Sequence, residues 1–330
     1  MLKKVHRCII ASVAGMAAII ATSGISYADL TLDPAASAAG FTLTTFADQI
    51  PTNGAVGPVG ISFTPTGGVI IASYGSGVNA VFASDTDNQH FAGAVLSTDT
   101  FAGPAGIAHI GNNYYEAIQF SGQVIQIDGN TGNFVANVAS IGGATGLVAN
   151  PVNGHLFVSN VNQVFDLNPA DGSVTVFANI PFDGMAITPD GKTLYGAASA
   201  YGQIFGYDTT TGLQVYASSI IPGGIDGSAL GTGTLAGNMF VNTNSGTLVE
   251  LNLTTNVQTL IASGGSRGDF VEVDPNGSLL LTQTDSVLRL TAPTGGGFST
   301  VPEPSSFALM GLGGIGLAIG AYRRKRVAAV

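Results

Sequence analysis

The sequence predicts an all-β protein whose main domain is a six-bladed β-propeller closed by an N-terminal strand. Three observations carry this prediction. Groups of short apolar runs recur between residues 41 and 290, with group starts spaced by 38 to 46 residues. Two series of hairpin turns keep the same register as these groups. A further strand-like run, at 41–47, stands alone ahead of the first group.

The clearest unit is residues 183–217, in which turn residues separate four apolar runs. We expect its strands at 185–187, 193–197, 203–207 and 213–217. Runs of this length, bounded by clusters of Gly, Pro, Asp and Thr, are typical of β-strands joined by tight hairpins. One such unit cannot bury both of its faces, so it must stack on copies of itself.

Six units follow one another along the chain. Their first strands begin at Gly60, Gly106, Gly146, Gly184, Gly227 and Phe270. A period near 40 residues with four strands per unit is typical of a propeller. The sixth unit ends after its third strand, at Leu290, so we expect the run at 41–47 to supply the fourth strand and close the ring.

The N-terminal segment 1–28 has the layout of a secretory signal peptide. Basic residues precede an apolar run at 9–21, and small residues lead to a cleavage site after Ala28. A retained membrane anchor is the alternative. Cys8, the single cysteine, lies in this segment, so the cleaved chain has no thiol and no disulfide. We expect 29–40 to be an exposed leader and 291–300 a flexible linker.

The C-terminal segment 301–326 has three parts. They are the motif Val301, Pro302, Glu303 and Pro304, an apolar stretch at 307–322 that we expect to form a membrane-spanning helix, and the basic cluster Arg323, Arg324, Lys325 and Arg326. Residues 327–330 form a short tail. Sixteen apolar residues are slightly short for a bilayer span of about 20 residues, and the basic cluster should remain cytoplasmic.

In order and spacing these parts resemble a PEP-CTERM sorting signal. The resemblance implies export through the inner membrane of a Gram-negative bacterium, transient membrane anchoring, and cleavage near Pro302-Glu303-Pro304 by an exosortase. It implies a final location at the cell surface or outside the cell, often beside exopolysaccharide. The alternative is an ordinary C-terminal anchor.

Between residues 29 and 301 the chain carries three basic and nineteen acidic residues, a net charge of −16. Such a surface repels nucleic acid and anionic lipid. Divalent cations, neutral polysaccharides and small molecules remain plausible partners.

Candidate site residues lie just before the first strands, where each unit should reach one mouth of the central channel. Three consecutive units have an aspartate there, Asp183, Asp226 and Asp269, each 43 residues apart. Converging carboxylates repel one another unless a cation, water or Arg267 compensates their negative charge. We therefore expect that calcium or another divalent cation could bind there. The alternative is that Asp before Gly or Phe serves only the turn into the strand.

The array of units also resembles the NHL-repeat and gluconolactonase families of six-bladed propellers. The gluconolactonase resemblance implies a divalent metal held by a first-blade Glu and by Asn or Asp at later blade starts. Asp183 and Asp226 match the later positions, but Val56 stands where the Glu is expected. This departure argues against the lactonase reaction, because the metal would lose a ligand.

Other candidates are weaker. Asp85, Asp87 and Asn88 have a spacing suggestive of a calcium loop, although an acidic hairpin tip explains them equally well. His90, His109 and His155 lack metal-binding spacing. The sequence has neither the Gly-x-Ser-x-Gly motif of a nucleophilic hydrolase nor the Gly-Lys-Ser/Thr motif of a phosphate-binding loop. Tyr195, Tyr201, Tyr207 and Tyr216 are interpreted as core and surface β residues, with sugar stacking as the alternative.

We therefore expect an exported, exosortase-processed binding or structural module rather than an enzyme, with a ligand or matrix polysaccharide as its partner. The alternative is a divalent-metal-dependent lactonase or lyase working at the channel mouth. A purely structural matrix protein is a third interpretation.

Overall fold

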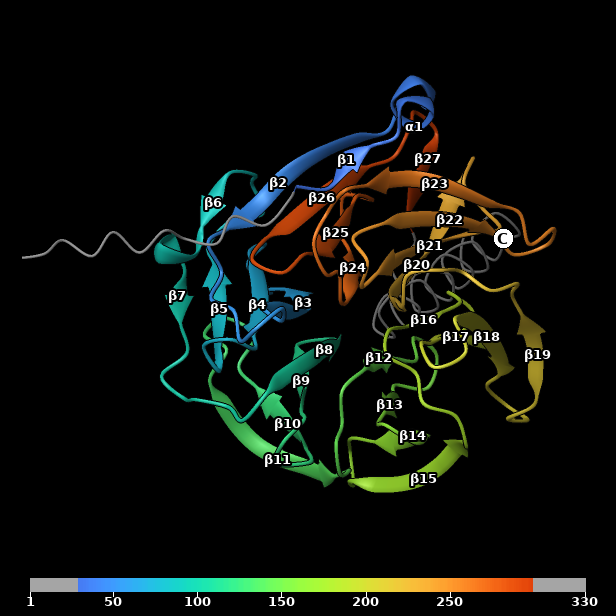
Figure 1. Cartoon of the computed structure of the whole chain (residues 1–330). Helices are drawn as coiled ribbons and strands as arrows, with labels where there is room; N and C mark the ends of the chain where they lie inside the picture. Colours follow the sequence, from blue (N-terminus) through green and yellow to red (C-terminus); the bar gives the residue numbers. More distant parts are fainter. Residues whose placement is uncertain (1–28, 299–330) are drawn as a thin grey trace, which may run out of the picture.

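The computed structural model describes residues 29–298, and these form six β-sheets around a central axis (Figure 1). Each sheet contains a blade of four antiparallel strands, and two of the sheets carry additional short strands, so the predicted six-bladed propeller is confirmed. The signal peptide 1–28 and the sorting segment 301–326, including the expected helix 307–322 and the tail beyond it, lie outside the described residues. Between residues 29 and 298, no helix has the length and apolar character needed to cross a membrane.

The first three blades follow one another along the chain, each running from the axis outward. Blade 1 contains β3 (Pro58–Phe63), β4 (Val69–Ser73), β5 (Val78–Phe82) and β7 (Val95–Leu96). Blade 2 contains β8 (Pro104–Ile110), β9 (Asn113–Ile118), β10 (Gln123–Ile127) and β11 (Phe134–Ser140). Blade 3 contains β12 (Leu147–Ala149), β13 (Leu156–Ser159), β14 (Val164–Asn168) and β15 (Ser173–Ala178).

The last three blades complete the ring. Blade 4 contains β16 (Met185–Ile187), β17 (Thr193–Ala198), β18 (Gln203–Asp208) and β19 (Gln214–Ala217). Blade 5 contains β20 (Ile225–Gly233), β21 (Asn238–Thr243), β22 (Leu248–Asn252) and β23 (Gln258–Ser263). Blade 6 contains β24 (Val271–Val273), β25 (Leu279–Thr282), β26 (Val287–Thr291) and β2 (Thr42–Asp48).

The turns between strands three and four repeat the same chemistry from blade to blade. In blade 2, Asp128 Oδ1 accepts hydrogen bonds from the backbone N–H groups of Asn130 and Thr131, both at 2.9 Å. Gly132 then takes the left-handed backbone conformation, at φ 67°. In blade 5 Asn256 occupies the equivalent left-handed position, at φ 59°, because Asn tolerates this region better than most residues. The aligned turns therefore mark a shared backbone geometry.

The hydrophobic core consists of six clusters, one at each interface between neighbouring blades. Strand β25 shows how they arise. Its Leu279 and Leu281 belong to the cluster shared with blade 5, and Leu280 belongs to the cluster shared with blade 1. Successive side chains of a strand point to opposite faces of the sheet, and neighbouring blades cover both faces. These strands are therefore apolar at successive positions rather than at alternate ones.

The ring is closed by the N-terminal strand, as predicted. Strand β2 pairs antiparallel with β26, with Thr42 opposite Thr291 and Leu43 opposite Leu290. The short strand β6 (Gln89–His90), which precedes the 3₁₀ turn η1 (Phe91–Gly93), then adds to β2 in parallel. Both ends of the domain thus meet in one blade, which leaves no open seam.

The segment 29–40, expected to be an exposed leader, is mostly exposed, but it forms regular structure against blade 5. Strand β1 (Thr31–Leu32) pairs with β23 at the rim of blade 5, and helix α1 (Pro34–Ala39) follows it. The Asp33 side chain caps α1 by accepting a hydrogen bond from Ala35 N at 2.9 Å. Leu30 is buried in the cluster between blades 5 and 6. The segment is too short to show a periodic pattern of apolar residues, so the sequence did not predict these elements. They form through contacts with blade 5.

Within the segment 291–300, expected to be a flexible linker, the last described residues form a paired strand. Strand β27 (Gly296–Phe298) pairs antiparallel with the end of β20. Phe298 is only 3% exposed, and its ring lies 4.9 Å from that of Phe240. The glycine run 295–297 permits this close pairing, although its composition resembles that of a linker.

A buried arginine joins blade 1 to the closing blade. Arg289 on β26 forms ion pairs with Asp85, with Asp87 at 2.7 Å, and with Asp274. Its guanidinium also lies 5.5 Å from the centre of the Phe46 ring. Asp85 and Asp87, which we considered as a calcium loop, therefore face an arginine. Burial raises the pKa of Asp85 to about 6, although Arg289 lowers it.

We predict that Arg289→Met lowers the free energy of unfolding by about 3 kcal/mol, because it leaves three carboxylates facing one another without a cation. Urea denaturation measures this change. Lys192→Met is the matched control, since Lys192 pairs only with exposed Asp190 at 3.4 Å and should cost less than about 1 kcal/mol. Equal losses in the two variants would contradict a structural role for Arg289.

Candidate functional site

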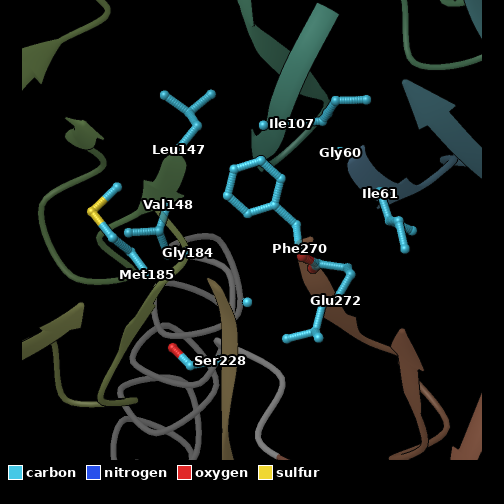
Figure 2. Close-up of a pocket in the computed structure, with 13 residues that line it drawn as sticks. Gly60, Ile61, Ile107, Leu147, Val148, Gly184, Met185, Ser228, Phe270 and Glu272 are labelled. Carbon is cyan, nitrogen blue, oxygen red and sulfur yellow. The ribbon is translucent and has the colours of Figure 1, made fainter. Parts of the chain in front are cut away.

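The first strands of the six blades line a narrow central channel, as predicted (Figure 2). The cavity inside it has a volume of about 50 Å³, enough for a few water molecules but far below the roughly 300 Å³ of a typical small-molecule pocket. A substrate at the axis would therefore have to bind at one of the two mouths.

The channel is narrow because glycines stand where the first strands approach one another. A Cβ atom on Gly60 would lie 2.0 Å from the carbonyl oxygen of Ala105 in the next blade. A Cβ on Gly184 would lie 2.6 Å from Asp226 O, and the N–H of Gly227 donates to Asp269 O at 3.0 Å. Any larger residue would push neighbouring blades apart at the axis.

Blade 6 departs from this pattern. Phe270 takes the place of the glycine, and Figure 2 shows its ring projecting across the channel. The next position in each blade is apolar except in blade 5, which has Ser228. Ser228 is 4% exposed and its Oγ has no hydrogen-bond partner among the described residues. Glu272 also lines the channel, and burial raises its pKa to about 8, so the group is mainly neutral near pH 7.

Three carboxylates converge at one mouth, as the spacing of Asp183, Asp226 and Asp269 predicted. Asp226 and Asp269 approach the same Arg267 side chain, and a Cβ atom on Gly184, next to Asp183, would lie 2.6 Å from Asp226 O. The charges of Asp269 and Asp183 raise the pKa of Asp226. Arg267 compensates the charge. Its Nε donates to both carboxylate oxygens of Asp269 at 3.0 Å, and its Nη2 lies 3.8 Å from Asp226 Oδ2.

Asp226 is the carboxylate of this group that carries a buried oxygen without a hydrogen-bond partner among the described residues. It is 4% exposed, and burial is the main reason why its pKa lies well above the ordinary range. One of its carboxylate oxygens, Oδ1, is buried and has no hydrogen-bond partner within the described chain. Asp183 accepts a hydrogen bond from Ser199 Oγ, and burial raises its pKa as well. A proton or a second cation would stabilise this group.

The other half of the mouth is apolar or uncharged. Blades 1, 2 and 3 place Val59, Ala105 and Thr145 at the positions equivalent to the aspartates. Val56, at the position of the expected first-blade Glu, packs into the cluster that also contains Tyr74 and Phe270. The mouth is therefore acidic on one side and hydrophobic on the other.

The fit to a metal is incomplete. Among residues 29–298, no group of three or more His, Cys, Asp or Glu side chains is arranged so that it could hold a metal ion. The carboxylates of Asp226 and Asp269 instead face Arg267. The divalent cation inferred from the spacing of the aspartates stays a prediction.

The histidines are not brought together. His90 Nδ1 lies 2.5 Å from Asp48 Oδ1, and His155 Nδ1 lies 2.7 Å from Asp166 Oδ1. His109 stacks on the Tyr114 ring and lies 3.2 Å from Ser62 Oγ. Each histidine thus has its own local environment, in agreement with the absence of a metal-binding spacing.

Sequence analysis missed three polar residues of the channel, Ser199, Ser228 and Glu272. Aligning the unit starts would have revealed two of them. At the position of Ser228 the other units have Ile, Leu, Met or Val, and at the position of Glu272 the other units have small or apolar residues. Ser199 lies in a turn of variable sequence, and only the structure shows that it reaches Asp183.

The mouth face also carries exposed aromatic rings. We define this face by the aspartates and by the turns that join strands two and three of each blade. Phe120, in the turn between β9 and β10, is 68% exposed, and its ring lies 5.7 Å from that of Tyr74. Tyr201, in the turn between β17 and β18, is 55% exposed. Rings placed in this way offer apolar faces to a ligand that spans the mouth.

Comparison with known proteins gives a sequence match at the C-terminus and fold matches for the propeller. Residues 300–326 match the PEP-CTERM protein-sorting motif. No curated protein matches the chain in sequence. The propeller is similar to a luciferin-regenerating enzyme, with a TM-score of 0.63 and 13% identity, covering 79% of this chain and 99% of that one.

Two further solved structures share the fold. A gluconolactonase of Xanthomonas campestris has a TM-score of 0.62 and 16% identity, covering 81% of this chain and 95% of its own. An auxiliary nutrient binding protein of Bacteroides ovatus has a TM-score of 0.57 and 12% identity, covering 76% of each chain. At such identities the likeness establishes the fold alone, and enzymes and a binding protein both use this fold.

Proposed function

We propose that the chain is an exported, exosortase-processed propeller that binds a neutral polysaccharide or a related polyhydroxy ligand at its mouth face. The sorting motif at 300–326 carries the export half of the proposal. This motif indicates an exported, sorted protein, processed by an exosortase and directed to the surface of a Gram-negative cell. To this we add two proposals. Residues 307–322 anchor the chain in the membrane before cleavage, and the propeller binds its ligand afterwards.

The mouth face supports the binding half. Exposed aromatic rings such as Phe120 and Tyr201 stack on the apolar faces of sugar rings. The carboxyl group of Asp183, which is only partly buried, can accept hydrogen bonds from hydroxyl groups. The net charge of −16 on residues 29–301 favours a neutral glycan over an anionic one.

A divalent-metal-dependent lactonase or lyase is the second candidate, and one observation favours it. Asp226 has a buried oxygen without a hydrogen-bond partner in the described structure, beside two further carboxylates. Asp183, Asp226 and Asp269 would hold the metal, which would act by polarising a carbonyl group. Arg267 and the apolar Val56 weigh against this candidate, because the first pairs with two of the ligands and the second supplies none.

The first prediction from this proposal concerns processing. Replacing Pro302, Glu303 and Pro304 together by alanine should retain the full-length chain in the membrane fraction, whereas the wild type is shortened and reaches the cell surface or medium. Immunoblotting of fractions from a bacterium with an active exosortase measures this outcome. Ser305→Ala with Ser306→Ala is the matched control and should be processed normally. Full-length wild type in the cytoplasm would contradict export.

The second prediction concerns the mouth face. Replacing Phe120 and Tyr201 together by alanine should weaken glycan binding at least tenfold, since each stacked ring contributes about 1 kcal/mol. Binding of the purified propeller to an array of neutral glycans measures this loss. Phe134→Ala removes a ring that is 43% exposed on the outer strand β11, and it should leave binding unchanged. Equal binding by all three proteins, or none by the wild type, would contradict the proposed site.

The third prediction separates the two candidates by metal binding. Millimolar calcium should not shift the melting temperature of the wild type, because Arg267 already compensates the carboxylates. It should raise the melting temperature of Arg267→Met, in which that compensation is lost. A rise of several degrees in the wild type that Asp226→Asn abolishes would favour the metal-dependent enzyme instead.

A further inference from the structure

A carboxyl group is buried between blades 1 and 2, away from the mouth. It belongs to Glu116 on β9, which is 0% exposed. Its neighbours on the same face of the strand, Tyr114 and Ile118, belong to the apolar cluster between these two blades. Glu116 pairs with Ile107 of the first strand, and the other five blades have an apolar residue or glycine at the corresponding position of the second strand. These residues are Ile71, Val158, Gly196, Val241 and Leu281.

The partner of Glu116 is Asn79 on β5 of blade 1. Asn79 is also 0% exposed. Its Nδ2 donates to Glu116 Oε2 at 2.8 Å and to the carbonyl oxygen of Gly132, in the turn between β10 and β11, at 3.0 Å. Because both of these contacts need a donor, they fix the orientation of the amide and leave Oδ1 as its free acceptor. The side chain of Asn79 therefore joins blade 1 to blade 2 at two points.

Each of the two side chains has one oxygen that lacks a partner. Asn79 Oδ1 and Glu116 Oε1 are both buried and have no hydrogen-bond partner among the described residues. Two acceptors cannot satisfy each other, but a protonated carboxyl group has an O–H donor as well as an acceptor. A carboxylic acid and a primary amide can therefore form two hydrogen bonds, one in each direction. A single proton on Glu116 Oε1 would satisfy both oxygens.

The surroundings of Glu116 favour the protonated form. No Lys or Arg occurs between residues 58 and 140, the range that contains blades 1 and 2. Strands β4, β5 and β10 have no titratable residue. The titratable groups on the other elements around this interface are His109, Tyr114, Tyr115, Asp99 and Asp128. Burial raises the pKa of Glu116 to about 8, although the hydrogen bond from Asn79 lowers it.

These groups leave Glu116 without a cation. His109 stacks on the Tyr114 ring and lies 3.2 Å from Ser62 Oγ. Tyr115 points to the other face of β9, into the cluster between blades 2 and 3. Asp99 and Asp128 carry the same sign of charge as an ionised Glu116, and both accept backbone N–H groups in turns. An ionised Glu116 would therefore be a buried anion with no counter-ion, which is costly.

We propose that Glu116 is a neutral carboxylic acid that donates its proton to Asn79 Oδ1, so that two hydrogen bonds join blade 2 to blade 1, and that loss of this proton at alkaline pH loosens the joint. The proposal does not depend on what the mouth binds. The same interface also carries part of the mouth face, because Tyr74 of blade 1 donates to Gln119 Oε1 of blade 2 at 3.1 Å and its ring contacts Phe120. Loosening the joint would therefore affect these rings.

NMR of isotopically labelled glutamate tests the protonation directly. The full chain has only four glutamates, so labelling their carboxyl carbons gives four signals, from Glu116, Glu250, Glu272 and Glu303. The signal that disappears in Glu116→Gln belongs to Glu116. If that variant does not fold, replacing the other three glutamates by Gln gives the same assignment. The Glu116 carboxyl should titrate near pH 8, far above the ordinary 4.5. A carboxyl already ionised at about pH 6 would overturn the proposal.

The pH dependence of stability tests the joint. Gln has the shape of protonated Glu and the same donor and acceptor, so Glu116→Gln should keep the pair at every pH. Because folding raises the pKa from 4.5 to about 8, the folded chain binds this proton more tightly than the unfolded chain, and the stabilisation is lost as the pH rises through 8. Between about pH 6 and about pH 9, the folded-to-unfolded ratio of the wild type should fall on the order of a hundredfold relative to Glu116→Gln. Urea denaturation measures this change, and parallel pH profiles for the two proteins would overturn the proposal.

Hydrogen exchange shows where the structure loosens. At alkaline pH, the amides of β5 and β9 should exchange faster in the wild type than in Glu116→Gln, and at about pH 6 they should exchange alike. Glu250→Gln is the matched control, because Glu250 accepts a hydrogen bond from Asn238 at 2.6 Å within a single blade. It should exchange like the wild type at β5 and β9. An alkaline increase spread evenly over all six blades would contradict a joint between blades 1 and 2.

Discussion

The close approach of glycine backbones at the axis is the constraint on which the rest of this structure depends. At Gly60, Gly184 and Gly227 the backbone of one blade lies against the backbone of the next, with no room for a side chain between them. This spacing makes the channel narrow, and it brings the residues before the glycines together at one mouth. The convergence of the aspartates is therefore a result of blade packing as much as of the aspartates themselves. Phe270 interrupts the ring of glycines and narrows the channel further.

The ring is secured where blades 5, 6 and 1 meet. The N-terminal segment supplies β1 to blade 5 and β2 to blade 6, and the C-terminal segment supplies β27 to blade 5. Arg289 adds an ionic link from blade 6 to the loop of blade 1. The sequence has a single cysteine, so no intramolecular disulfide can constrain the chain, and these pairings have to perform the same role. In Figure 1 the blue and red ends of the chain lie side by side in this region.

The mouth combines buried carboxylates with exposed aromatic rings. Buried carboxylates with raised pKa values, such as that of Asp226, are common at functional sites, but here Arg267 forms ion pairs with Asp226 and Asp269. The same fold supports enzymes and a nutrient binding protein, so the fold does not decide between these roles. The exposed aromatic rings on the same face as the acidic mouth are the reason we favour binding. Display of such a face is consistent with sorting to the cell surface.

The sequence by itself determined the number of blades, their turns and the closing strand, because these features depend on local chemistry that repeats with a fixed period. It also located Asp183, Asp226 and Asp269 at one mouth, since a repeated position in a symmetric array has a predictable place. Tertiary structure alone decided the order of 29–40 and of 291–298, because those segments have no period of their own and fold only against blades 5 and 6. It alone showed that Arg289 faces Asp85 and Asp87, which lie about 200 residues earlier in the chain. Such pairings depend on which surfaces meet when the ring closes. The local sequence pattern of a single unit therefore cannot predict them.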